Sequence, residues 1–280
     1  MNLSASTGHL GRHAVSFVLI EPSHPGNVGS AARALQVMGF ERLILVNPRF
    51  DSMNTHPEAV AFASGAGRVL NACQTVGTLA EAASGARMTV AVSAAGREFA
   101  PPPSSPREIA RTAVDMLETI PTEPAASTVG KPMVALVFGT ERVGLSIAQA
   151  QMCSHLCTID ADPAYSSLNL AQALQIIAYE MRSALVESQS GGSDPDVRGA
   201  ERAGHPDDWP ATHDRVEGML AHLEKTLVTI GYLDPAQPKR LMPRLRQLFS
   251  RAALTSKEVD IWRGICQKID RVAKQEGAHD

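Results

Sequence analysis

Polar residues at the start of a long helical pattern are the first candidates for a binding site. Ser166, Ser167 and Asn169 directly precede an apolar pattern of helical spacing that begins at Leu170. Their side-chain oxygens suit helix capping, because the first turn of a helix leaves its backbone N–H groups unpaired. The same unpaired groups can hold a polar or anionic ligand. Taken alone, this stretch fits an ordinary helix cap as well as it fits a ligand cradle.

Two other stretches carry side chains of complementary chemistry. Asn27 and Arg33 lie at the start of another predicted helix, just after a cluster of turn formers. Glu141 lies between Gly139 and Gly144, two residues that allow the backbone to come close to a ligand. An amide, a guanidinium and a carboxylate are groups that position a polar substrate.

Several other chemistries are excluded by what the sequence lacks. It shows no Ser-His-Asp arrangement, no convincing carboxylate pair, no phosphate-binding loop and no G-x-G-x-x-G after its first strand. Cys153, His155 and Cys157 resemble half of a zinc site, but no second ligand pair follows at a suitable spacing. We therefore expect no metal, and the four cysteines are too scattered to form a disulfide framework.

The predicted secondary structure brings the polar stretches to one edge of a sheet. Helical patterns alternate with apolar runs typical of buried strands at residues 14–20, 42–46, 88–92, 133–138 and 156–159. This alternation predicts an α/β fold with a mostly parallel sheet, in which ligands bind at the carboxyl ends of the strands. The polar stretches, and residues 93–97, all follow such strands.

Composition divides the chain into four parts. We expect a flexible leader at residues 1–13, an α/β domain at 14–187, a flexible linker rich in Ser, Gly, Pro and Asp at 188–208, and a helical domain at 209–280. From Lys239 onward the chain has ten Lys and Arg residues against five Asp and Glu. This excess fits a phosphate-bearing partner or an ordinary solvated helix face.

The whole chain has the composition of a soluble globular protein. It has 280 residues, 44% of them hydrophobic and 20% charged, and a net charge of −3. It has no apolar run of about 18 residues and no secretory signal, so we expect a cytoplasmic protein without a membrane partner.

Three motifs resemble those of the SpoU branch of the SPOUT methyltransferases. They run from Asn27 to Arg33, from Phe138 to Leu145 and from Ser167 to Asn169, and the match covers roughly residues 14–186. Within this branch, EPSHPGNVGSAARA, YSSLNLAQALQIIAYE and the tail EKTLVTIGYLDPAQPKRLMPRLRQLF are most similar to the TrmJ group.

The resemblance implies a function, a cofactor and a partner. It implies a deep trefoil knot, a homodimer, and methylation of the ribose 2′-hydroxyl of nucleotide 32, C or U, in the anticodon loop of tRNA, with no DNA partner. The helical tail would be an RNA-binding extension. By position in the motifs, S-adenosylmethionine would be held by Val92, Ser93, Ala94, Gly139, Ile159, Ser166, Ser167 and Leu168.

The resemblance also implies a catalytic set, which consists of Asn27, Arg33, Glu141, Ser167 and Asn169. The family pattern names Arg33 for drawing the proton from the 2′-hydroxyl. Since a guanidinium stays protonated, Arg33 acts as a base only in an unusual environment, or it binds phosphate and orients the hydroxyl. Glu141 would hold Arg33 or a loop amide. The alternatives are the same reaction on ribosomal RNA or at another tRNA position, and a noncatalytic RNA-binding protein with the same fold.

Overall fold

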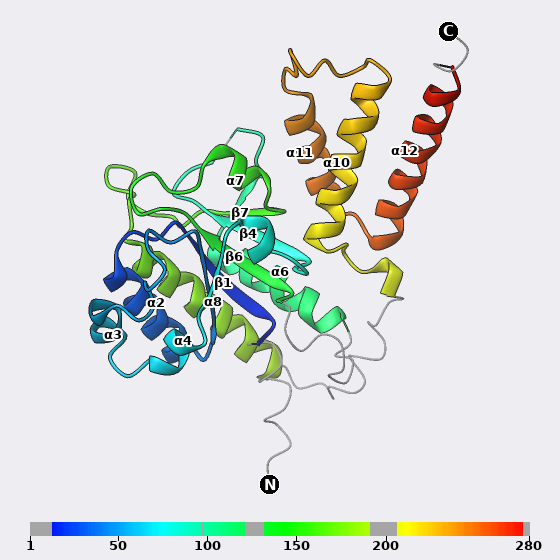
Figure 1. Ribbon diagram of the computed structural model, residues 1–280. Helices are drawn as coiled ribbons and strands as arrows, with labels where there is room; N and C mark the ends of the chain where they lie inside the picture. Colours follow the sequence, from blue (N-terminus) through cyan, green and yellow to red (C-terminus); the bar gives the residue numbers. More distant parts are fainter. Residues whose placement is uncertain (1–12, 97, 121–131, 191–205, 277–280) are drawn as a thin grey trace.

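The computed structural model describes residues 13–96, 98–120, 132–190 and 206–276 (Figure 1). Nearly all of the predicted leader and most of the predicted linker lie outside these residues. Helix α8 continues to Ser190, so the first three residues of that linker are helical, and its last three form the 3-10 helix η1 (Pro206–Asp208).

One parallel sheet forms the centre of the larger domain. Its seven strands follow the order β3-β2-β1-β6-β4-β7-β5. They are β1 (Val15–Ile20), β2 (Arg42–Val46), β3 (Gln74–Val76), β4 (Met88–Val92), β5 (Pro103–Ser104), β6 (Val134–Phe138) and β7 (His155–Cys157). Every residue of β1, β4 and β6 is buried, as expected for apolar strands with helices on both faces. The prediction of an α/β fold with a mostly parallel sheet is confirmed.

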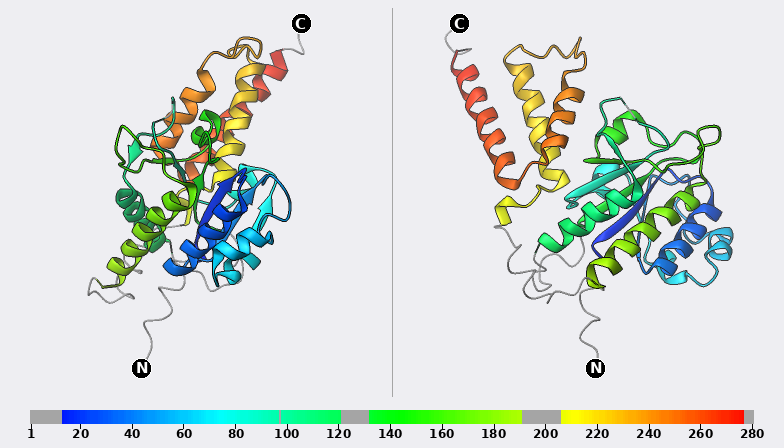
Figure 2. Two further views of the ribbon diagram at one scale, coloured as in Figure 1. Left: turned by 90° about the vertical axis from the view of Figure 1, so that its left-hand side faces the viewer. Right: turned by 180° about the vertical axis from the view of Figure 1, so that it is seen from behind.

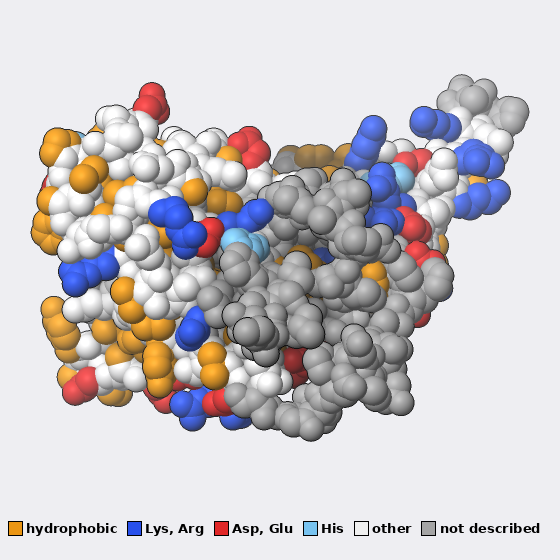
Figure 3. Space-filling view, turned by 90° about the horizontal axis from the view of Figure 1, so that it is seen from below, with side chains coloured by type: hydrophobic (Ala, Val, Ile, Leu, Met, Phe, Trp, Pro, Cys, Tyr) orange, Lys and Arg blue, Asp and Glu red, His pale blue; other side chains and the backbone are white. Residues whose placement is uncertain are grey.

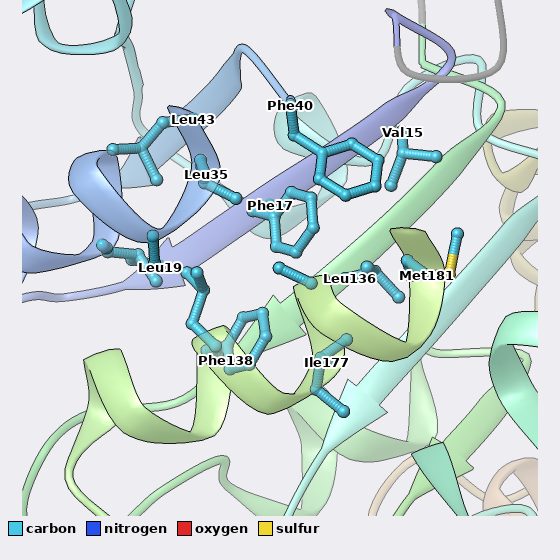
Figure 4. Close-up of a cluster of buried hydrophobic side chains, with 14 of the residues drawn as sticks. Val15, Phe17, Leu19, Leu35, Phe40, Leu43, Leu136, Phe138, Ile177 and Met181 are labelled. Atoms are coloured by element: carbon cyan, nitrogen blue, oxygen red, sulfur yellow. The ribbon is translucent and has the colours of Figure 1, made fainter. Parts of the chain in front are cut away.

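Three long helices cover one face of the sheet. These are α2 (Pro25–Met38), α6 (Pro106–Thr119) and α8 (Leu170–Ser190), and α8 packs against both of the others. The core beneath them contains aromatic side chains of β1 and β6, with Phe17 and Phe138 stacked at a centroid distance of 6.3 Å (Figure 4). Ile177 and Met181 of α8 are buried against the same cluster. Because these apolar side chains of α8 are buried in the core, the helix is held in place relative to the strand ends, and so is the loop before it.

Shorter helices complete the domain. α3 (Pro57–Ala63) and α4 (Gly67–Asn71) pack against α2. A second core lies on the opposite face of the sheet, beneath α5 (Leu79–Ala82) and α7 (Ile147–Gln151). None of the helices within the described residues is long and apolar enough to cross a bilayer. The deep trefoil knot stays a prediction.

The C-terminal helices form a bundle with its own core. α10 (His213–Thr229), α11 (Leu241–Ala252) and α12 (Ser256–Glu276) stand side by side beyond one edge of the sheet (Figures 1 and 2). Phe249 and Trp262 meet edge to face in this core at a centroid distance of 5.1 Å. The helical structure predicted for the tail is confirmed.

The bundle is bonded to the larger domain near the starts of β4 and β7. His213 N donates to Ala86 O at 2.7 Å, and Gly85 N donates to Asp214 Oδ1 at 3.0 Å. Ser250 Oγ of α11 donates to Ser154 O at 2.9 Å. We call this contact the seam between bundle and sheet domain.

Candidate functional site

The strand register brings three loops to one edge of the sheet. Leu19 of β1 is paired with Phe138 of β6, and Val92 of β4 is paired with both Phe138 and Cys157 of β7. The loops that follow these strands therefore leave the sheet beside one another. They contain the three polar stretches that the sequence singles out.

The carboxylate of Glu141 joins the loop after β6 to the loop after β1. Its Oε1 accepts hydrogen bonds from Ser23 N at 3.1 Å, His24 N at 3.2 Å and Asn27 Nδ2 at 3.3 Å. Its Oε2 accepts from Ser23 Oγ at 3.0 Å. Glu141 thus holds loop amides, and no bond to Arg33 is found among the described residues. From the sequence, Glu141 could hold either Arg33 or a loop amide, and in the structure it holds the loop amides.

Asn27 extends this connection to the third stretch. Its Oδ1 accepts a hydrogen bond from Asn169 Nδ2 at 3.0 Å. Asn169 Oδ1 in turn accepts from Ala171 N at 2.9 Å, so Asn169 also caps α8. The capping role that the sequence offered for Asn169 is therefore present, and the same side chain also bonds Asn27. Glu141, Asn27 and Asn169 form a continuous chain of hydrogen bonds, which we call the amide relay.

The environment of Glu141 keeps its side chain ionised. Burial raises the pKa of this carboxyl, but hydrogen bonds from its own backbone N–H and from Ser23, Asn27 and His24 lower the pKa by more. The net pKa lies below the usual range of a glutamate. An ionised carboxylate whose oxygens are already occupied by donors positions loops and is poorly suited to accept a substrate proton near neutral pH.

Arg33 lies outside the amide relay. It is exposed on α2, about 9 Å along the helix axis from Asn27. Its neighbours Ala32 and Ala34 are buried against the core, which fixes the backbone that carries the guanidinium. No ion pair or hydrogen bond to Arg33 is found in the part of the chain that the structure describes. The guanidinium is therefore available to an external anion.

The loop after β6 is closed by a backbone contact that requires glycine. Thr140 N donates to Gly144 O at 3.2 Å, and Gly144 N donates to Thr140 O at 3.0 Å. A Cβ on Gly139 would lie 2.0 Å from the carbonyl carbon of Gly144, and Gly144 has φ 68°. The two glycines thus let the loop fold back on itself and present Glu141.

The residues predicted to hold the cofactor lie in two places, at the ends of the strands and in the loop before α8. Val92, Ser93 and Gly139 are buried at the adjacent ends of β4 and β6, and Ser93 N donates to Cys157 O at 3.0 Å. Ile159 is half-buried and Ala94 is exposed. A further set lies exposed in the loop before α8, namely Ser166, Ser167 and Leu168.

One buried atom at this edge fits a polar ligand. Thr158 Oγ1 is buried and has no hydrogen-bond partner among the described residues. It follows β7 directly, and its backbone N donates to Ser104 O at 3.0 Å. An unpaired buried hydroxyl is costly unless a ligand or water satisfies it, so the site suits a cofactor rich in hydrogen-bonding groups, such as S-adenosylmethionine.

Sequence reasoning missed Thr158 and Ser23 as site residues. A polar residue at the carboxyl end of an apolar strand is the signal that identifies Thr158. Ser23 has no such signal, because its role depends on Glu141, which follows it by 118 residues.

Cys153 and Cys157, which resemble half of a zinc site in the sequence, are buried. Within the described ranges, no group of three or more His, Cys, Asp or Glu side chains is arranged to hold a metal ion. Burial raises the pKa of the thiols of Cys153 and Cys157 to about 12, with a smaller contribution from Glu217 at Cys153. Both thiols stay protonated at neutral pH.

The basic residues of the bundle do not form one free surface. Arg240 pairs with Glu98, Arg246 pairs with Glu217, and Lys257 lies within 4 Å of two carboxylates. Exposed cations remain on α12, at Arg263, Lys268, Arg271 and Lys274. Figure 3 shows Lys and Arg side chains gathered at the end of the molecule that the bundle forms.

Two family models match the chain. The SpoU rRNA Methylase family matches residues 14–179, and the C-terminal domain of tRNA methyltransferase TrmJ matches residues 214–278. The tRNA (cytidine/uridine/adenosine-2′-O-)-methyltransferase TrmJ of Pseudomonas aeruginosa is 40% identical over 93% of this chain and 95% of its own length. The tRNA (cytidine/uridine-2′-O-)-methyltransferase TrmJ of Salmonella typhimurium is 39% identical over 93% and 98%.

Solved structures agree with these matches. The crystal structure of TrmJ from Z. mobilis ZM4 superposes with a TM-score of 0.71 at 28% identity, covering 91% of this chain and 98% of that one. A probable methyltransferase from Bordetella pertussis Tohama I has a TM-score of 0.56 at 46% identity, covering 63% and 99%.

Proposed function

The chain belongs to the SpoU rRNA Methylase family, and from this membership we propose that it methylates the ribose 2′-hydroxyl of nucleotide 32, a cytidine or uridine, in the anticodon loop of tRNA. S-adenosylmethionine supplies the methyl group, as an electrophilic carbon on its sulfonium. Between tRNA and ribosomal RNA, the match of residues 214–278 to the TrmJ C-terminal domain favours tRNA. The reaction would take place in the cytoplasm.

The amide relay is the observation that carries the proposal. Methyl transfer needs the hydroxyl, the methyl carbon and the leaving sulfur in line, so the groups around them must hold fixed positions. Glu141, Asn27 and Asn169 bond three loops from distant parts of the chain into one unit at the edge of the sheet. Asn27, Asn169 and Ser167 then act by orienting the substrate ribose and the loop beside it.

Arg33 is the group that contacts the RNA in this proposal. A guanidinium carries a positive charge and has hydrogen-bond donors but no acceptor. It offers a fork of N–H donors that matches a phosphate. We therefore assign it to binding the phosphate next to the target ribose, which places the 2′-hydroxyl at the edge of the sheet.

The cofactor would lie where the strand ends meet. The backbone and side chains that we assign to it are those of Val92, Ser93, Ala94, Gly139, Ile159, Ser166, Ser167 and Leu168. To these we add Thr158, whose buried hydroxyl is unpaired among the described residues. The loop before α8, exposed in the single chain, would close over the cofactor's apolar surface with Leu168.

We also propose that the enzyme works as a homodimer. Val37 of α2 is 68% exposed and Tyr179 of α8 is 54% exposed, on two helices that pack side by side. Figure 3 shows hydrophobic side chains gathered at the end of the sheet domain far from the bundle. Exposed apolar surface of this kind is typical of protein interfaces. Light scattering after size exclusion should give twice the mass of the chain, and a monomeric mass would contradict the dimer.

The test of the function is transfer of labelled methyl from S-adenosylmethionine to unmodified tRNA, with the product nucleotide mapped by digestion and mass spectrometry. Arg33→Ala should lose transfer, whereas Arg111→Ala, at an exposed arginine of α6, should keep it. Methyl at nucleotide 32 supports the proposal. Methyl at another tRNA position, or only on ribosomal RNA, would keep the chemistry and overturn the substrate.

A further inference from the structure

The chain from Ser93 to Ser104, which the structure describes except at residue 97, is hydrogen-bonded at both ends to the end of β7. At its start, Ser93 N donates to Cys157 O at 3.0 Å, and at its end Ser104 O accepts from Thr158 N at 3.0 Å. Ser104 is also the register partner of Cys157. Because of these bonds, a displacement of this segment would also move Ser93 and Thr158. Both residues lie on the edge of the sheet assigned above to the cofactor.

The middle of the same segment is held by α11 of the bundle. The guanidinium carbons of Arg240 and Arg244 lie 5.5 Å and 5.9 Å from the ring centroid of Phe99. Arg240 also pairs with the carboxylate of Glu98. Gln247 Nε2 donates to Ala100 O at 3.2 Å. Helix α11, together with the residue that precedes it, thus contacts three successive residues of the segment by cation–π, ionic and hydrogen-bonding contacts.

The backbone at Phe99 indicates that these contacts hold the segment in place. Phe99 has φ 58°, in the left-handed region that bulky side chains rarely adopt. Such a conformation persists only where its surroundings determine it. The neighbouring residue is fixed from the sheet domain as well, because Gln151 Nε2 of α7 donates to Glu98 O at 2.8 Å. The two arginines are the partners of the Phe99 ring itself.

We infer that Phe99 is a positioning residue, and that Arg244 of α11 and Arg240, which directly precedes this helix, act through it to set the cofactor-binding edge of the sheet domain. The C-terminal bundle then has a second role besides RNA contact, since it supports cofactor affinity. This inference rests on the proposed function only in that the edge binds S-adenosylmethionine. By linkage, cofactor binding would also stabilise the seam between bundle and sheet domain.

The test is isothermal titration of full-length protein with S-adenosylmethionine alone, without RNA. Phe99→Ala should raise the Kd about fivefold, and Arg240→Ala with Arg244→Ala should raise it by a similar factor. All three changes together should do no more than either alone, because they remove the same contact. Phe99→Tyr keeps the ring and should bind as the wild type does. Arg263→Ala with Arg271→Ala removes two exposed charges from α12 and should leave the Kd unchanged.

The results distinguish this inference from the proposed function. A wild type that binds S-adenosylmethionine, with folded Phe99→Ala and arginine variants of equal Kd, would overturn the inference alone. A wild type without cofactor affinity would overturn the proposed function and the inference with it. Thermal unfolding checks that each variant is folded. If Phe99→Ala does not fold, the Kd of the variant with both Arg240→Ala and Arg244→Ala tests the inference instead. A lower Tm with an unchanged Kd would mean that the seam only stabilises the protein.

Discussion

Replacing Glu141 by alanine should separate the amide relay from ordinary loop stability. The change removes the acceptor for Ser23 N, Ser23 Oγ, His24 N and Asn27 Nδ2. Hydrogen bonds to charged groups contribute about 1.5–3 kcal/mol each when well shielded. Here Ser23 is half-buried and His24 is exposed, so water replaces part of what is lost. We expect the free energy of unfolding to fall by about 2–3 kcal/mol in total, well below the sum of four shielded hydrogen bonds.

The effect on the rate should be larger than the effect on stability. Without Glu141, the bond from Asn169 to Asn27 remains, but the loop after β1 loses its hydrogen bonds to the loop after β6 and is free to shift relative to it. A misplacement of about 1 Å costs about 100-fold in rate in a reaction that depends on alignment. The measurements are urea unfolding and the rate of methyl transfer to tRNA under saturating cofactor.

Glu81 provides a matched control. Its carboxylate accepts a hydrogen bond from Gly77 N at 2.9 Å in a loop after β3, so it ties down a turn in the same way but away from the site. Glu81→Ala should lower stability by about 1 kcal/mol and leave the rate unchanged. Two results would contradict a role of the amide relay in aligning the reacting groups. One is a wild-type rate of methyl transfer in Glu141→Ala, and the other is an equally large loss of rate in Glu81→Ala.

Three further changes test the packing and electrostatics of the same domain. Gly139→Ala should prevent stable folding of the loop, because its Cβ would lie 2.0 Å from the backbone of Gly144. In Gly26→Ala the Cβ would meet the end of the flexible Glu58 side chain at 2.8 Å and the Phe62 ring at an ordinary contact distance of 3.6 Å, so this variant should stay folded. Circular dichroism and thermal melting would show the difference. The pKa of Glu141 is lowered in the folded state, so its contribution to stability is present at neutral pH. This contribution should be lost as the pH falls below the ordinary pKa of a glutamate, about 4.3, and through the folded-state pKa. In urea titrations the advantage of the wild type over Glu141→Gln should therefore shrink over this acidic range, and a constant difference would contradict this. Ile177→Ala, at a side chain only 1% exposed, should lower the free energy of unfolding by about 2–5 kcal/mol, and a loss below 1 kcal/mol would show that the core refills the space.

The long buried strands and the order of the site loops could be predicted from the sequence. Continuous apolar runs identify β1, β2, β4 and β6 nearly to the residue, since these strands are buried on both faces. β3 and β5 were missed because they are short and largely exposed, and β5 begins in a proline-rich stretch. Strands of two or three residues leave no periodicity to detect.

The contacts within the site could not be predicted from the sequence. That Glu141 binds the amides of Ser23 and His24 depends on β1 lying next to β6, a pairing set by long-range packing. The position of the C-terminal bundle also depends on long-range packing and could not be predicted. The basic residues from Lys239 onward fitted a phosphate-bearing partner or a solvated helix face, but two of them, Arg240 and Arg244, face Phe99 of the sheet domain. Charge is visible in a sequence, whereas the partner of each charge is not.

The central place of β1 in the sheet has a consequence for how the protein is made. Val15 pairs with Val134, and Ser16 Oγ donates to Val134 O, so the first strand to leave the ribosome completes its pairing only after β6 has been synthesised. Until then β1 can pair with β2 on one edge, while its other edge lacks the strand β6 that covers it in the folded protein. Such non-local pairing slows folding and leaves strand edges open to misassembly. The nascent chain should therefore depend on chaperones over this interval, and slowing translation between β2 and β6 should lower the yield of folded protein.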